Sequence, residues 1–205
     1  MEKVILIFGN TSSGKSFLGK NIQMKYGLPY LSFGDLKRKE INKRSNLGLS
    51  LQSNINEGMP INPSDGFSLI NKNILSVGTS AISLSGYPIS EIEYSQLSLL
   101  YQIVFGIYLK ISEETMRKRF FNRGVCPVCD FPGSFNNLCP LHNLNMIRRE
   151  DATEEELSKR IELFNKRINP FIELVTRNNL FPLKIYNSEF INFGSIYSDI
   201  NEYLE

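Results

Sequence analysis

The chain has 205 residues, of which 41% are hydrophobic and 21% charged, and its formal net charge is +2. This composition is typical of a globular protein of one or two domains and excludes a disordered chain, while the near-neutral charge gives no electrostatic reason to expect binding to nucleic acid or to an anionic membrane. No apolar run approaches the roughly 18 residues of a membrane span, and the N-terminal segment lacks a secretory pattern. We therefore expect a soluble, cytoplasmic protein, and we expect a monomer.

Predicted strands and helices alternate along the chain. Residues 4–8 form a continuous apolar run that ends at a glycine, as in a buried parallel strand, and residues 15–26 have helical spacing. Further strands are expected at residues 30–33, 81–84, 103–109 and 181–186. Further helices are expected at 34–46, 64–76, 112–123, 153–177 and 191–204, and the fourth of these starts at a capping box on Thr153 and is disturbed at Pro170. The alternation predicts an α/β fold with a parallel sheet.

A glycine-rich segment between the first predicted strand and helix fits the pattern GxxxxGK(S/T). In such a loop, backbone N–H groups and the helix N-terminus bind phosphate oxygens, the lysine reaches the β- and γ-phosphates, and the last hydroxyl can ligate Mg²⁺. The alternative is a chance glycine-rich turn, which the flanking strand and helix disfavour. The residues expected to bind ATP here are Gly9, Asn10, Thr11, Ser12, Ser13, Gly14, Lys15 and Ser16.

All three cysteines and the single histidine of the chain lie within one short segment, residues 124–148. Cys126 and Cys129 form one knuckle with two intervening residues, and Cys139 and His142 form a second. Four ligands from two such turns predict a structural zinc ion; the alternative is three unrelated thiols and a surface histidine. Because the segment has few apolar residues, we expect the metal to supply its folding free energy.

Four further segments, in chain order, resemble motifs of one enzyme family. Residues 26–38 (YGLPYLSFGDLKR) are similar to YGxPxxSTGDxLR, and residues 85–88 (SGYP) stand where that family has DGFP. Arg119 and Arg123 in RFFNRGVC, and Arg149 and Arg160 in RREDATEEELSKR, match the arginines that enter and leave its lid. Along nearly its full length the chain resembles the adenylate kinases of the zinc-lid type, which are P-loop nucleoside monophosphate kinases.

The resemblance implies a P-loop NTPase-type three-layer α/β fold in three parts. A core of residues 1–31, 79–123 and 149–205 would bind ATP, a helical insert of residues 32–78 the acceptor, and a lid of residues 124–148 zinc. It also implies transfer of the γ-phosphoryl group of ATP, with Mg²⁺, to a nucleoside monophosphate, by default AMP. Such transfer needs alignment and several cations around the developing charge. The implied catalytic residues are Lys15, Arg119, Arg123, Arg149 and Arg160, of which Arg119 and Arg123 would also bind ATP.

The acceptor half departs from the family pattern at four positions. Phe33 replaces the threonine of STGD, Ser85 the aspartate of DGFPR, Ile89 its arginine, and Glu93 the glutamine that contacts adenine. Losing the arginine costs roughly 2–5 kcal/mol of phosphate binding, unless another cation such as Lys37 or Lys39 replaces it. The implied acceptor residues are Phe33, Asp35, Arg38, Gly86, Ile89, Glu93, Arg149 and Arg160.

Glu93 leaves two interpretations of the acceptor base open. A carboxylate only accepts hydrogen bonds, so it would suit the N–H donors of guanine better than the N1 acceptor of adenine. Alternatively, Glu93 is an exposed helix carboxylate that contacts no base.

Two other functions compete with AMP phosphorylation. The chain could be a catalytically weak or retuned ATP-binding homologue with a regulatory role or with another acceptor such as GMP. It could also be a zinc-knuckle nucleic-acid binder, although the near-neutral charge argues against this.

Overall fold

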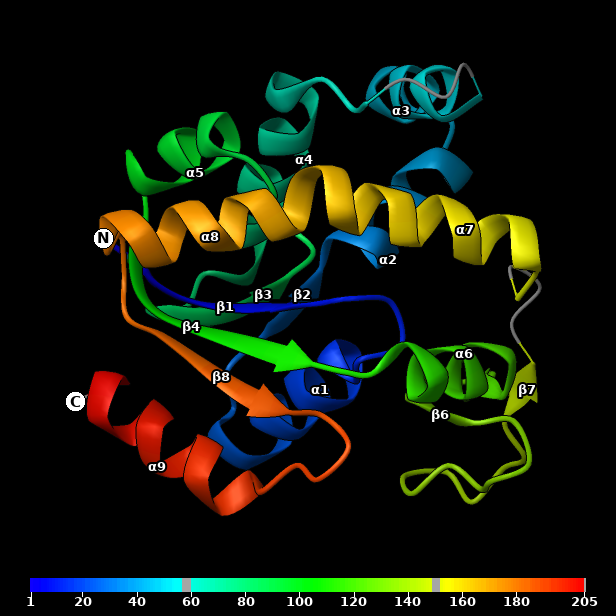
Figure 1. The fold of residues 1–205 in the computed structure, drawn as a ribbon. Coiled ribbons are helices and arrows are strands. Elements are labelled where there is room, and N and C mark those ends of the chain that lie inside the picture. The colour runs from blue at the N-terminus through cyan, green and yellow to red at the C-terminus, as the bar shows by residue number, and fades with distance from the viewer. Residues whose placement is uncertain (57–59, 149–151, 205) are drawn as a thin grey trace.

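The computed structural model describes residues 1–56, 60–148 and 152–204, and its centre is a five-stranded sheet (Figure 1). The strand order is β2-β3-β1-β4-β8, and every neighbouring pair is parallel. The predicted α/β fold with a parallel sheet is therefore confirmed. The strands are β1 (Lys3–Gly9), β2 (Tyr30–Ser32), β3 (Ala81–Ser85), β4 (Gln102–Lys110) and β8 (Leu183–Asn187).

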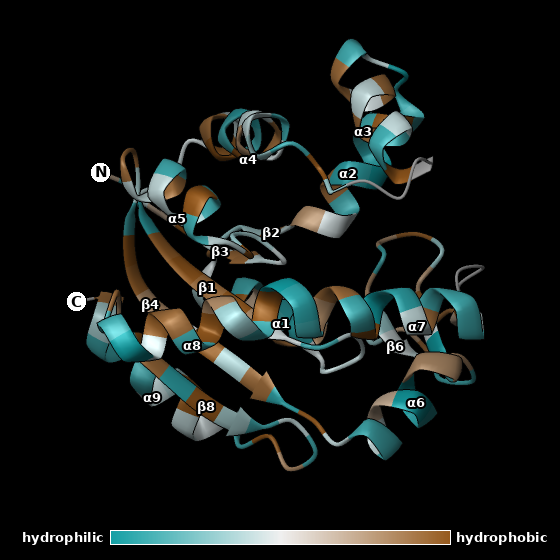
Figure 2. Cartoon of the chain, turned by 45° about the horizontal axis from the view of Figure 1, so that its top comes forward, coloured by the Kyte–Doolittle hydropathy of each residue, from teal (hydrophilic) through white to brown (hydrophobic). Residues whose placement is uncertain are grey.

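Both faces of the sheet are covered by helices, which explains the unbroken apolar run of β1. Because successive side chains of a strand point to opposite faces, Val4, Leu6 and Phe8 belong to one core cluster and Ile5 and Ile7 to the other. The hydrophobic strands run between two helical layers (Figure 2). Helices α1 (Lys15–Tyr26) and α9 (Phe193–Leu204) pack on the face of Ile5, whereas α4 (Pro63–Val77), α5 (Glu91–Ser98) and α8 (Asn169–Asn178) pack on the face of Val4.

Residues 33–56 form two helices, whereas one helix over residues 34–46 was predicted. The structure has α2 (Phe33–Asn42) and a separate α3 (Asn46–Asn56), and α3 was not predicted. The chain turns at Arg44, whose φ of 52° is left-handed. The Ser45 hydroxyl then accepts the N–H of Gly48 at 2.9 Å and starts the new helix. Helix α5 was also missed, although Ser90 caps it in the same way by accepting the N–H of Glu93.

The predicted long helix is present and is disturbed where expected. The Thr153 hydroxyl accepts the N–H of Glu156 and caps α7 (Glu154–Leu163), which runs through the π-helical segment η1 (Phe164–Ile168) into α8. Pro170 lacks the N–H that would bond to the carbonyl four residues earlier, so the ladder is interrupted next to it.

Residues 123–148 form a small unit with its own antiparallel sheet, in the order β6-β5-β7. Its buried core consists of Cys126, Phe131, Cys139 and Met146. Phe131 also contacts Phe17 of α1, with ring centroids 5.9 Å apart. The strands are β5 (Arg123–Val125), β6 (Pro132–Ser134) and β7 (Ile147–Arg148), and β5 follows α6 (Glu113–Phe121).

Among the described helices, none has the length and apolar character needed to cross a membrane.

Candidate active site

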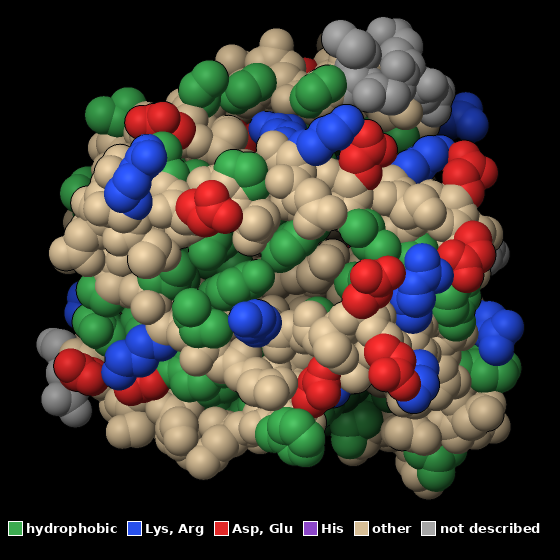
Figure 3. Space-filling view, in the orientation of Figure 1, with side chains coloured by type: hydrophobic (Ala, Val, Ile, Leu, Met, Phe, Trp, Pro, Cys, Tyr) green, Lys and Arg blue, Asp and Glu red, His purple; other side chains and the backbone are tan. Residues whose placement is uncertain are grey.

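A cleft of about 1760 Å³ opens at the carboxyl ends of β1, β2 and β3. Ligands of parallel α/β sheets bind at this edge. The volume exceeds the roughly 300–1,000 Å³ of an ordinary small-molecule pocket, so the cleft has room for two nucleotide-sized ligands. On the surface of α6 and α7, basic and acidic side chains alternate (Figure 3), and pairs such as Lys118–Glu114 and Lys159–Glu155 neutralise each other at the edge of the cleft.

The glycine-rich loop joins β1 to α1 along one wall of the cleft. The Lys15 ammonium donates to the carbonyl oxygens of Gly9 and Asn10, both at 2.7 Å. Gly9 has a φ of +146°, and a Cβ there would lie 2.4 Å from the Ser13 hydroxyl and 2.7 Å from the Leu109 carbonyl oxygen. Only glycine fits this position. No side chain caps α1 at Gly14, so its first N–H groups are available to an anion.

The pKa of Lys15 is far below its usual value. Burial, together with a smaller effect of the nearby positive charge of Arg160, lowers this pKa to about 7. An anion bound in the loop would reverse both effects because it stabilises the ammonium form.

Three of the predicted catalytic arginines line the cleft from different elements. The Arg119 guanidinium donates to the hydroxyl of Ser188 at 3.2 Å and to its carbonyl oxygen at 3.0 Å. The guanidinium carbons of Arg123 and Arg160 lie 4.1 and 5.7 Å from the ring centroid of buried Phe120. The structure thus brings these arginines to one region. The fourth, Arg149, lies outside the described residues.

The predicted acceptor residues of α2 line the same cleft. Phe33 is buried against Tyr87, with ring centroids 5.2 Å apart, and Asp35 pairs with Arg38. Gly86, with a φ of 77°, lies next to the Phe33 Cβ and also lines the cleft. Phe33 therefore places an apolar ring where the family that the chain resembles has the hydroxyl of a threonine.

Of the two lysines suggested as replacement cations, only Lys37 lines the cleft. Its ammonium lies 5.2 Å from the centroid of the Phe33 ring. Burial lowers the pKa of Lys37, and the charges of Arg38 and Arg160 lower it further. Lys39 is exposed and is not part of the described cleft lining.

Glu93 is 2% exposed, so its interpretation as an exposed helix carboxylate is wrong. Its Oε2 accepts the backbone N–H of Ile89 at 2.7 Å, and its Oε1 faces the Arg167 guanidinium at 3.4 Å. Arg167 also lines the cleft, and the sequence analysis missed it. The sequence did offer a signal for Arg167. It lies seven positions, or two helical turns, after Arg160, which places both side chains on the same helix face.

Tyr30, which the sequence analysis did not single out, contacts two residues that line the cleft, Ser16 and Ser85. Its hydroxyl lies 2.6 Å from the Ser85 hydroxyl and donates to the Ser16 hydroxyl at 3.3 Å. The ring lies so close to α1 that a Cβ on Gly19 would come within 2.2 Å of it. The Tyr30 phenol thus lies between the phosphate loop and Ser85, the position at which the family that the chain resembles has an aspartate.

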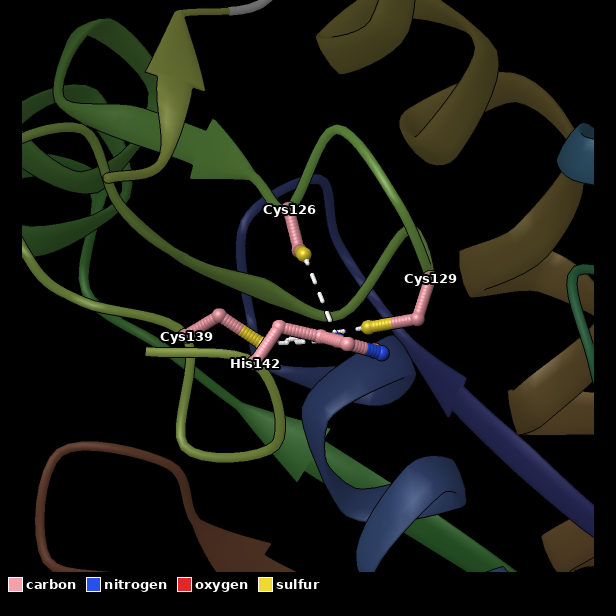
Figure 4. Close-up of side chains that lie close together, drawn as sticks. All are labelled: Cys126, Cys129, Cys139 and His142. Carbon is pink, nitrogen blue, oxygen red and sulfur yellow. Dashed lines mark hydrogen bonds between the residues drawn. The ribbon is translucent and has the colours of Figure 1, made fainter. Parts of the chain in front are cut away.

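The four predicted metal ligands converge (Figure 4), with their ligand atoms all within 4.8 Å of one another. The Cys129 and Cys139 sulfurs are 3.8 Å apart, and the His142 Nδ1 is 3.8 Å from the Cys126 sulfur and 3.7 Å from the Cys139 sulfur. Two sulfurs bound to one tetrahedral zinc at about 2.3 Å are separated by about 3.8 Å, so this donor set fits the ion.

The cysteine knuckle also favours the thiolate that a metal needs. Burial alone would raise the pKa of Cys126, but hydrogen bonds from the backbone N–H groups of Cys129 and Val128 and from the side chains of Cys139 and Cys129 together more than offset it and lower this pKa to about 6.

Comparisons with known proteins identify one family. The family model described as adenylate kinase matches residues 7–180. The adenylate kinase of Thermococcus kodakarensis is 31% identical over 190 residues, covering 86% of this chain and 84% of the relative. That of Pyrococcus furiosus is 31% identical over 189 residues, covering 86% of each chain. That of Mycoplasma mobile is 25% identical over 202 residues and covers 92% of each.

Gly19→Ala should destabilise the protein, although the same change in a helix interior ordinarily stabilises it. The added methyl collides with the Tyr30 ring, and such overpacking costs about 1–3 kcal/mol. Urea unfolding measures the effect. Gly34→Ala is the matched control, because there the nearest atom would be 3.6 Å away, on the flexible Arg38 side chain. Equal unfolding midpoints for Gly19→Ala and wild type would contradict the close packing.

The protein purified without chelator should hold about one metal ion per chain, since one tetrahedral site is formed. Removing the ion under reducing conditions should increase hydrogen exchange in residues 123–148 before the central strands, because the small core of this unit depends on its cysteines. Elemental analysis that finds much less than one metal per chain, together with unchanged exchange, would contradict this assignment.

Binding of ATP at pH 8 should take up a proton. The free Lys15 ammonium, with a pKa of about 7, is largely neutral there, and the phosphates would return it to the charged form. Calorimetric titrations in two buffers of different ionisation enthalpy measure the uptake, with Lys15→Met as the control that should abolish it. Identical heats in both buffers for the wild type would rule out this coupling.

Proposed function

Because this chain belongs to the adenylate kinase family, we propose that its cleft transfers the γ-phosphoryl group of ATP to AMP. Members of this family are ATP-dependent nucleoside monophosphate kinases, and the chain is such an enzyme. The observation that supports the proposal best is the position of Lys15, Arg119, Arg123 and Arg160 around one cleft that has room for both nucleotides.

The proposed donor site is the glycine-rich loop with the arginines of α6 and β5. The loop residues 9–16 would hold the phosphates of ATP, with the Lys15 ammonium on the β- and γ-phosphates. When bound, Mg²⁺ would neutralise charge on these phosphates, and the Ser16 hydroxyl, which lines the cleft, is suited to hold it.

In the proposed reaction, an oxygen of the acceptor phosphate attacks the γ-phosphorus while the bond to the β–γ bridging oxygen breaks, so that two nucleoside diphosphates form. The negative charge that spreads over the transferred group is stabilised by Arg119, Arg123 and Arg160. Arg149 belongs to this proposed set on the family resemblance alone.

The proposed division into parts follows the positions of these groups. Residues 1–31, 79–123 and 149–205 would form the ATP-binding core, residues 32–78 the acceptor-binding insert, and residues 124–148 the lid. The metal proposed for the lid is zinc, with no open coordination position, so it would stabilise the lid and take no part in the reaction.

The contacts of Glu93 remove the sequence-based reason to expect GMP as the acceptor. Both carboxylate oxygens already face donors within the protein, the Ile89 amide and the Arg167 guanidinium. These internal contacts satisfy the buried Glu93 carboxylate, so a contact with guanine is not needed to explain a carboxylate at this position.

A coupled assay should show the fastest ATP-dependent phosphorylation with AMP, compared with GMP, CMP, UMP and dTMP. Lys15→Ala should lower kcat by about 100-fold or more, since it removes a cation from the developing charge. Tight ATP binding by the wild type without transfer to any of the five monophosphates would overturn the proposal and favour a regulatory, catalytically weak protein.

A further inference from the structure

Arg167 occupies a position that the established family motifs do not explain. It belongs to the π-helical segment η1, its side chain is 23% exposed, and it lines the cleft. The neighbouring Lys166 is largely exposed and pairs with Glu162, so Arg167 is the basic residue of η1 that is directed into the interior.

A buried carboxylate holds Arg167 in place. Glu93 is 3% exposed as a side chain, and such a group requires a cation or hydrogen-bond donors. The Ile89 amide donates to one oxygen, which fixes the carboxylate to the backbone, and the other oxygen faces Arg167 at 3.4 Å. The contact uses one of the five N–H donors of the guanidinium, which leaves donors for a ligand.

The same contacts place Arg167 beside Ile89. One carboxylate bridges the Ile89 backbone and the Arg167 guanidinium, so the guanidinium lies next to the residue whose side chain lacks a charge. Lys37, Arg38 and Arg160 line the same cleft. Arg167 thus adds a cation at the part of the acceptor wall where the sequence lacks one.

We propose that Arg167 binds the phosphate of the acceptor nucleotide from η1, in place of an arginine at position 89, and that Glu93 is its positioning residue. This inference rests on the proposed function, because it takes the ligand of this wall to be a nucleoside monophosphate. An arginine is suited to the task because its planar fork can bind two phosphate oxygens at once.

The test compares AMP with adenosine, which lacks the phosphate, by calorimetric titration of the wild type and Arg167→Ala. AMP binding should weaken by about 10- to 100-fold, the effect of losing a charged hydrogen bond, while adenosine binding stays unchanged. Arg177→Ala is the matched control, since Arg177 is an exposed arginine of α8 outside the described cleft lining, and it should bind both ligands as the wild type does. Equal losses for AMP and adenosine would indicate a merely structural role, and unchanged AMP binding would also overturn the inference.

A compensating variant adds a second readout. Ile89→Arg in the Arg167→Ala background should recover AMP affinity without changing adenosine affinity, because it returns a guanidinium to the same part of the wall. Failure of this variant to recover any affinity, while it unfolds at the wild-type midpoint, would contradict the proposed equivalence of the two positions.

Turnover separates this inference from the proposed function. Binding of AMP that depends on Arg167, with no phosphoryl transfer by the wild type, would refute the proposed function and leave the phosphate site standing. Normal transfer with an unchanged KM for AMP in Arg167→Ala would refute the inference and leave the proposed function standing.

Discussion

Mutual repulsion among cations is the constraint on which this cleft depends. Lys15, Lys37, Arg119, Arg123, Arg160 and Arg167 all line one space, and charges gathered in this way disfavour one another unless the protein compensates them. Burial is the larger cause of the lowered pKa of Lys15, to about 7, and of the lowered pKa of Lys37, and repulsion from neighbouring arginines contributes to both. An anionic ligand with several phosphates relieves the repulsion, so the same arrangement that strains the free protein favours nucleotide binding.

The protein keeps these cations in place with a small number of buried or half-buried groups. Phe120 presents its ring to Arg123 and Arg160, Glu156 accepts from Arg160, and Glu93 faces Arg167. The contact with Glu93 uses only part of the Arg167 guanidinium, because an arginine has more donors than one partner can use. Preorganisation of this kind lowers the cost of assembling charge around a transferring phosphoryl group.

The proposed donor and acceptor sides of the cleft differ in the groups that they offer to a phosphate. On the proposed donor side, the groups suited to bind phosphate belong mostly to the backbone, and local sequence fixes the Gly9 conformation and the uncapped start of α1. On the acceptor side, side chains from distant segments meet. Tyr30 links Ser16 to Ser85, and Glu93 links the Ile89 amide to Arg167, which lies 74 positions after Glu93 in the chain. Substitutions on that side are therefore accommodated by partners that no local motif includes.

The sequence by itself determined the parallel α/β sheet, the phosphate loop, the metal-ligand set and the disturbance near Pro170, because each depends on residues that are close in the chain or on a strict period. It did not determine the turn at Arg44 that separates α2 from α3, since a left-handed residue in a polar stretch leaves no strong periodic signal in the sequence. Only the tertiary structure decided that Glu93 is buried, that Arg167 faces the cleft and that Tyr30 lies between Ser16 and Ser85. Burial and long-range pairing depend on which elements pack together, and that is set by the whole sheet with its two helical layers rather than by any single segment.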